Sequence, residues 1–125
     1  MREQKPVVLV VEDEFLVQIV AVDLLEERGF KVDAVFTAEE AIQHLRRHCG
    51  EIDVLFTDIN LGGGQDGFEL ARAARELCPG IRVIYVTGAP QADVDKRRVQ
   101  DSVFLQKPYP IDQVVREVAK VAAGR

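Results

Sequence analysis

Four short polar clusters in this sequence carry groups that could act together in one reaction. They are Glu12-Asp13-Glu14, Thr57-Asp58-Ile59-Asn60, Thr87-Gly88 and Gln106-Lys107-Pro108. Two carboxylates about 4 Å apart repel by roughly 4 kcal/mol at an effective dielectric near 20, so a group of acids needs cations to persist. Lys107 and one divalent ion would balance the three negative charges of Glu12, Asp13 and Asp58. A hard ion that takes oxygen ligands and keeps part of its water shell is Mg²⁺.

Each polar cluster follows an apolar run that has the length of a β-strand. The apolar runs are residues 7–11, 32–35, 54–56, 81–86 and 103–105, and no comparable cluster follows the second. Most runs are continuous and rich in Val and Ile, which predicts strands buried on both faces of a parallel sheet. Ligands gather at the carboxyl ends of such strands, so we expect the four clusters to meet at one edge.

Segments with helical periodicity separate the predicted strands. They are residues 15–28, 37–47, 68–77, 91–99 and a segment that starts at Pro110. Gly29 is a typical left-handed cap for the first, Thr37 with Glu40 predicts a capping box for the second, and Pro79 stops the third. The alternation predicts one α/β domain over residues 1–125, a (βα)₅ doubly wound parallel sheet, because a barrel needs about twice this length.

The composition narrows the class of protein. The chain has 125 residues, 47% of them hydrophobic, and a net charge of −5, which argues against holding nucleic acid or anionic lipid by bulk positive charge. The longest apolar run, residues 7–11, is too short to cross a membrane, and residues 1–6 are too polar for a secretory signal. We therefore expect a cytoplasmic protein.

The cysteines and histidines show no ligand pattern in the sequence. Cys49 and Cys78 each fall near a predicted helix end without a C-x-x-C motif, so free thiols are expected. His44 and His48 lack carboxylate or cysteine partners at ligand spacing and are expected to be solvated.

The order of the four clusters resembles that of one signalling family. An acidic pair, an Asp, a Thr and a Lys-Pro at successive strand ends make the chain similar to the receiver domain of bacterial two-component response regulators, particularly single-domain chemotaxis-type receivers. The resemblance covers essentially the whole chain. It implies the flavodoxin-like receiver fold, with five parallel strands in the order 2-1-3-4-5. It also implies a phosphorelay phosphoacceptor that assists its own phosphorylation and dephosphorylation, and no enzyme in the ordinary sense.

The resemblance assigns a role to each matching residue. Asp58 would accept the phosphoryl group. Mg²⁺ would be held by Glu12, Asp13, Asp58 and the backbone carbonyl of Asn60. Thr87, Gly88 and Lys107 would contact the phosphoryl group, and Thr87 with Phe104 would form the switch. The Lys107-Pro108 bond would be cis, an isomer otherwise seen in only about 5–6% of X-Pro bonds.

The resemblance also implies partners. The donor would be a histidine kinase or a histidine phosphotransfer protein, and the output an unknown protein target reached through the fourth helix, fifth strand and fifth helix. No direct contact with nucleic acid or membrane is implied, and homodimerisation stays open. Val17, Val20, Ala21, Leu24 and Leu25 form the predicted inward stripe of the first helix, which leaves Phe15, Ile19 and Val22 on an adjacent face. We expect Phe15 and Ile19 to anchor the phosphodonor.

Two features depart from the family pattern. Gly62-Gly63-Gly64-Gln65 makes the loop after Asp58 longer and more pliable than usual. The stretch from Thr87 to Lys107 is slightly short, which predicts a reduced or irregular fourth helix. The sequence identifies neither the cognate kinase nor the phosphoryl lifetime, and it leaves open a stand-alone regulator, a relay intermediate and a receiver excised from a hybrid kinase.

Three other functions share parts of this pattern. A haloacid-dehalogenase-type phosphohydrolase also forms an aspartyl phosphate, but Asn60 spoils its D-x-D motif. A flavodoxin-like electron carrier would need a phosphate loop where Glu12, Asp13 and Glu14 would repel the cofactor. A pseudo-receiver that serves only as an interaction module is disfavoured by the intact Asp58, Thr87 and Lys107.

Overall fold

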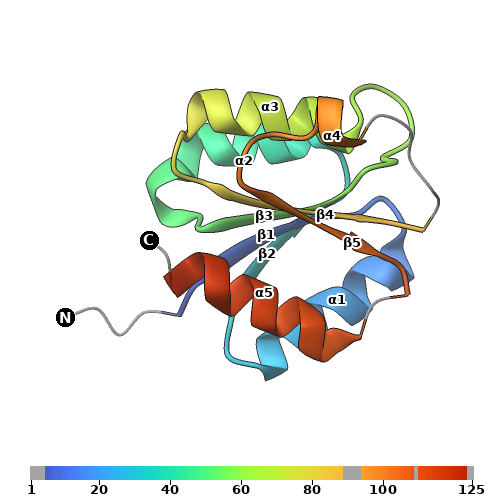
Figure 1. Cartoon of the computed structure of the whole chain (residues 1–125), viewed down its shortest axis with the longest axis vertical. Helices are drawn as coiled ribbons and strands as arrows, with labels where there is room; N and C mark the ends of the chain where they lie inside the picture. Colours follow the sequence, from blue (N-terminus) through green and yellow to red (C-terminus); the bar gives the residue numbers. More distant parts are fainter. Residues whose placement is uncertain (1–4, 89–93, 109, 124–125) are drawn as a thin grey trace.

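The computed structural model describes residues 5–88, 94–108 and 110–123, with side chains to residue 120 (Figure 1). The strands are β1 (Val7–Val11), β2 (Lys31–Val35), β3 (Val54–Asp58), β4 (Arg82–Thr87) and β5 (Ser102–Gln106). The helices are α1 (Phe15–Glu27), α2 (Ala38–His48), α3 (Gly67–Leu77), α4 (Val94–Arg97) and α5 (Ile111–Ala123), with a 3₁₀ turn η1 (Cys49–Glu51) after α2.

The strands form one parallel sheet in the order β2-β1-β3-β4-β5, which confirms the predicted topology. Helices α2, α3 and α4 cover one face, and α1 and α5 cover the other (Figure 1). The register pairs Val11 with Thr57, Asp58 with Val86, and Thr87 with Gln106. The last residues of these strands therefore lie at one edge of the sheet.

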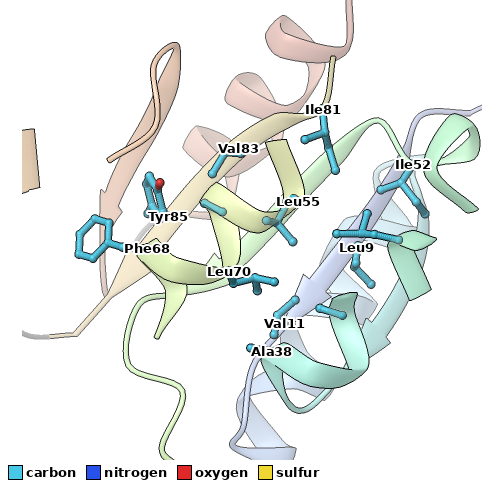
Figure 2. Packing of buried hydrophobic residues seen from close by; sticks show 14 of the residues in the cluster. Leu9, Val11, Ala38, Ile52, Leu55, Phe68, Leu70, Ile81, Val83 and Tyr85 are labelled. Carbon is cyan, nitrogen blue, oxygen red and sulfur yellow. The ribbon is translucent and has the colours of Figure 1, made fainter. Parts of the chain in front are cut away.

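Two apolar layers hold the helices on the sheet. The larger lies under α2 and α3 and includes Leu9, Leu55, Leu70 and Tyr85, all fully buried (Figure 2). The smaller lies under α1 and α5. The central strand β3 is buried along its whole length, both in the predicted apolar run 54–56 and at the polar residues Thr57 and Asp58 that follow it. The edge strand β2 is only partly buried, because it has a neighbour on one side alone.

Most of the predicted inward stripe of α1 is at least partly buried, but Val20 is an exception. Val20 was expected to face the core but is 56% exposed, whereas Gln18 is buried together with Ala21 and Leu25. Apolar residues surround most of this helix, so periodicity alone does not select one face. Gln18 is buried because hydrogen bonds to backbone carbonyls satisfy its amide group.

Helix α4 ends two residues before the end of the predicted segment 91–99. It spans Val94–Arg97, and residues 89–93 lie outside the described part of the chain. Arginines of α3 donate hydrogen bonds to the end of α4 and to the backbone after it: Arg72 donates to the carbonyl of Arg97 at 3.3 Å, and Arg75 donates to that of Gln100 at 2.7 Å. These side-chain hydrogen bonds connect the end of α4 and the backbone after it to α3.

The two cysteines correct the expectation of free thiols. Cys49 in η1 and Cys78 at the end of α3 form a disulfide, with their Cα atoms 5.6 Å apart. That separation is within the usual range for a disulfide. The pairing follows from the packing of α2 beside α3, which brings helix ends 29 residues apart in the chain into contact.

Candidate functional site

Asp58 ends strand β3 and is almost completely buried, with 6% of its surface exposed. Its Oδ1 accepts a hydrogen bond of 2.9 Å from the backbone N–H of Asn60, and its Oδ2 accepts one of 2.8 Å from Lys107 Nζ. Both carboxylate oxygens are therefore oriented by neighbouring groups before any ligand binds.

Lys107 follows strand β5 and joins two acidic side chains. Its Nζ lies 2.8 Å from Glu12 Oε1 and 2.8 Å from Asp58 Oδ2. Burial alone would lower the pKa of the Lys107 ammonium, but the hydrogen bonds and charges of Asp58 and Glu12 raise the pKa above its usual value. The amine therefore stays charged and stabilises both acids.

At Glu12, burial outweighs the hydrogen bonds and sets the direction of the pKa shift. Burial raises the pKa of the Glu12 carboxyl, and the Asp58 charge adds to that rise, while hydrogen bonds from Lys107 and the Glu14 N–H oppose it. One ammonium thus does not fully compensate the buried acids, and the site favours a further cation.

The acidic residues gather as the sequence predicts. Glu12, Asp13 and Asp58 each place a carboxylate oxygen so that all three lie within 4.8 Å of one another. Beside them is a cavity of about 340 Å³ lined by Asp13, Glu14, Asp58, Asn60, Gly88 and Lys107. A set of carboxylate oxygens in an open, hydrated cavity fits a hard divalent cation that keeps some of its waters.

Two glycines permit close approach at this site, and their importance was not recognised in the sequence. Gly62 has a φ of +59°, and a side chain there would place Cβ 3.1 Å from Asp13 Oδ2. A Cβ at Gly67 would overlap the backbone carbonyl oxygen of Asp58, and the Gly67 N–H donates to the Ile59 carbonyl at 2.7 Å. The D-G pair at the start of α3 was the available signal.

Thr87 ends strand β4 and is buried beside Asn60. The Asn60 side-chain amide donates to Thr87 Oγ1 at 3.4 Å, and the Lys107 N–H donates to the Thr87 carbonyl at 2.7 Å. The resemblance used only the backbone of Asn60, so this side-chain contact is new. Gly88, next along the chain, lines the cavity near the Lys107 side chain.

Two further expectations concern strand β5 and the residues after it. Phe104 is half-buried, pairs with Tyr85 in the sheet register, and packs against the apolar layer under α2 and α3. The peptide bond between Lys107 and Pro108 is cis, as the resemblance implies.

Gln18 is a site residue that the sequence did not reveal. Its Nε2 donates to the Val35 carbonyl at 2.7 Å and to the Glu12 carbonyl at 3.4 Å. The Glu12 N–H also donates to the Val35 carbonyl, at 3.2 Å. Gln18 thereby ties α1 to the backbone that carries the acidic pair. The only signal was one amide among the apolar residues of the first two turns of α1.

Exposed apolar side chains surround the start of α1. Phe15, Leu16, Ile19 and Val20 are 60%, 74%, 38% and 56% exposed. Phe36, from the loop after β2, extends this patch, since its ring lies 6.3 Å from that of Phe15. The patch borders the acidic cavity because Phe15 directly follows Glu14.

A family model described as the response regulator receiver domain matches residues 8–119. The chain belongs to this family. The sensor kinase CckA of Brucella abortus is 30% identical over 116 residues, which are 91% of this chain and 12% of CckA. The response regulator receiver protein CpdR of the same organism is 29% identical over 91% of this chain and 94% of its own length.

Solved receiver structures agree with this assignment. A response regulator receiver protein from Sinorhizobium medicae superimposes with a TM-score of 0.90 and 29% identity, covering 98% of each chain. The receiver is therefore homologous to phosphoacceptor domains of response regulators and histidine kinases, and neither the phosphohydrolase nor the electron carrier is favoured. Among its described residues, no helix is both long and apolar enough to cross a membrane.

Proposed function

We propose that this receiver accepts a phosphoryl group on Asp58 from a histidine kinase or a histidine phosphotransfer protein. The observation that carries the proposal is the position of Lys107 Nζ, 2.8 Å from both Asp58 and Glu12 at the edge of an open acidic cavity. An amine so placed neutralises charge where a phosphoryl group would reach Asp58.

The transfer needs little covalent chemistry from the rest of the protein. A carboxylate oxygen of Asp58 forms a bond to phosphorus while the bond from phosphorus to the donor imidazole nitrogen breaks. The electron pair stays on that nitrogen, and because the other ring nitrogen of the donor carries a proton, the products are an acylphosphate and a neutral imidazole. Position and charge supply most of the rate acceleration in such transfers.

Glu12, Asp13, Asp58 and the backbone carbonyl of Asn60 are the proposed ligands of Mg²⁺. Their oxygen donors suit a hard cation. When bound, the ion supplies positive charge that offsets the charge of the transferring group. The same residues would assist hydrolysis of the acylphosphate, so the receiver would contribute to its own dephosphorylation.

The proposed switch follows from the charge added at Asp58. An acylphosphate carries about −2 and offers new acceptor oxygens to Thr87, Gly88 and Lys107. The Thr87 hydroxyl would leave the Asn60 amide, 3.4 Å away, and donate to the phosphoryl group. Phe104 would then turn inward and reshape the surface of α4, β5 and α5, where an unidentified protein target would bind.

Intact mass spectrometry tests the acceptor. With acetyl phosphate and Mg²⁺, the parent chain should gain one phosphoryl group, and Asp58→Asn should gain none. Removing the divalent ion with a chelator should also prevent labelling of the parent. A folded parent that never gains phosphate would leave the pseudo-receiver interpretation standing.

We further propose that Phe15 and Ile19 contact the phosphodonor. They are exposed and lie on the first turns of α1, beside the acidic cavity. Replacing both with Ser should slow transfer from a cognate kinase and leave labelling by acetyl phosphate unchanged. Leu77→Ser is a matched control, because Leu77 is 37% exposed on α3, on the other face of the sheet. Equal loss with both donors would contradict the docking role.

The remaining assignments are proposals of the same kind. We propose that residues 1–125 form one receiver domain that works in the cytoplasm without direct contact with nucleic acid or membrane. Disulfides are rare in the reducing cytosol, so the disulfide between Cys49 and Cys78 should be reduced if the protein works there. Thiol labelling of the protein in rapidly quenched cells would test the compartment and the redox state together.

A further inference from the structure

A second group of metal-ligating side chains lies away from the phosphoacceptor site. It surrounds a cavity of about 360 Å³ lined by Val7, Lys31, Asp33, His44, His48, Glu51 and Ile52. Val7 and Lys31 are the first residues of β1 and β2, so the cavity opens toward the amino ends of the strands. The acidic cavity lies at their carboxyl ends.

The two histidines were expected to be solvated without partners, and the structure corrects this. His44 Nε2 lies 2.9 Å from Asp33 Oδ2, and His48 Nδ1 lies 2.6 Å from Glu51 Oε1. The partners come from β2 and η1, so ligand spacing along the helix did not reveal them. The two rings are adjacent, with centroids 4.7 Å apart.

The pairing resembles the outer half of a metal site. Each imidazole uses one nitrogen for a carboxylate, and its other nitrogen has no hydrogen-bond partner among the described residues. Metal-bound histidines typically make such a bond through the ring nitrogen that does not coordinate the metal. Histidines at positions i and i+4 of one helix also form a known zinc-binding pair.

We propose that His44 and His48 bind one divalent transition-metal ion, such as Zn²⁺ or Ni²⁺. Asp33 and Glu51 would orient the imidazoles, and their negative charges would offset the charge of the ion. Lys31, which also lines the cavity, adds one positive charge that opposes binding. In the described part of the chain, only Glu12, Asp13 and Asp58 form a trio of ligand atoms within 4.8 Å, so water completes coordination at the histidine pair. Imidazole ligands favour these ions over Mg²⁺.

Isothermal titration calorimetry with Ni²⁺ tests the proposal directly. The protein carries no affinity tag and is oxidised, and excess Mg²⁺ occupies the acidic cavity. One equivalent should bind, and the double variant His44→Gln/His48→Gln should bind at least about tenfold more weakly. The chain contains two histidines, so this variant removes every imidazole.

Controls separate this site from the other ligand groups. Asp58→Asn and Cys49→Ser/Cys78→Ser should each retain the parental Ni²⁺ affinity, while either single histidine variant should lose most of it. Binding that survives the double histidine variant would overturn the proposal. So would an affinity that depends on Asp58 or on the two cysteines, one that depends on a single imidazole, or the absence of saturable binding. None of these outcomes bears on phosphorylation of Asp58.

Discussion

The polar groups at the two ends of the strands differ in how they are paired. At the carboxyl ends, Glu12 and Asp58 share one amine, Lys107, and the pKa of Glu12 is raised. At the amino ends, each group has its own partner: His44 pairs with Asp33, and Cys49 with Cys78. Charges left uncompensated at the carboxyl ends mark the proposed place for Mg²⁺ and a phosphoryl group, whereas the pairs at the amino ends connect α2 to β2 and to α3.

The largest stability effect should come from the amino ends. Replacing Cys49 and Cys78 with Ala removes a crosslink between residues 29 apart, which should lower the free energy of unfolding by about 3 to 4 kcal/mol. Urea unfolding would measure this, with the reduced parent as a comparison. Labelling of Asp58 by acetyl phosphate should not change. An altered labelling rate would show that the two ends are coupled.

The largest effect on chemistry should come from Lys107. Lys107→Met keeps the length of the side chain but leaves Glu12 and Asp58 without their shared cation. Labelling by acetyl phosphate should slow by about a hundredfold, a typical loss when one preorganised charge is removed. Lys120→Met, on the exposed side of α5, is the matched control. If Lys107→Met were labelled at the parental rate, the Lys107 amine would have no role in the transfer.

Asp66 lies near the site and has its own hydrogen-bond and ion-pair partners. Its pKa is therefore lowered, whereas that of Glu12 is raised. Burial opposes ionisation, but the Glu69 N–H and Arg97 lower the pKa of Asp66 below its usual value. The stability it contributes is therefore present above the unfolded-state pKa of about 4 and is lost as pH falls through the lower folded-state pKa.

The substitution Asp66→Ala tests whether the lowered pKa of Asp66 contributes to stability. The variant loses the cap of α3 and the 2.6 Å ion pair to Arg97, which should lower the free energy of unfolding by about 1 to 2 kcal/mol at neutral pH. Urea unfolding at a series of pH values should show parent and variant converging below about pH 4. If the difference in free energy of unfolding between parent and variant stayed constant in acid, the lowered pKa of Asp66 would be contradicted.

The smallest expected effect concerns Gln18. Gln18→Met conserves volume but removes the donor to the Val35 and Glu12 carbonyls, which should cost about 1 kcal/mol of stability. If Gln18 holds the acidic pair in place, labelling should also need more Mg²⁺. Gln113→Met on α5 is the control. An unchanged Mg²⁺ requirement would limit Gln18 to a structural role.

The carboxyl-end site was predictable because it depends on strand order and strand ends. Continuous apolar runs located β1, β3, β4 and β5, and parallel register then placed Glu12, Asp58, Thr87 and Lys107 at one edge. No side-chain packing had to be known. The resemblance supplied the chemical roles that these positions imply.

The features that sequence reasoning missed depend on how helices pack. Cys49 meets Cys78, and His44 meets Asp33, only after α2 has settled beside α3 and β2. On α1, the many apolar residues hid the exposure of Val20, and the burial of Gln18 depends on a hydrogen bond to the backbone carbonyl of Val35. Such local choices leave no periodic signal.

The disulfide also encloses the segment that carries Asp58 and the exposed glycines Gly62, Gly63 and Gly64. A single proteolytic cut at those glycines would split the backbone without releasing a fragment from the oxidised protein. The nicked molecule would migrate as one species in a non-reducing gel and as two in a reducing gel. Limited digestion would therefore report the oxidation state of the chain in a form visible by electrophoresis.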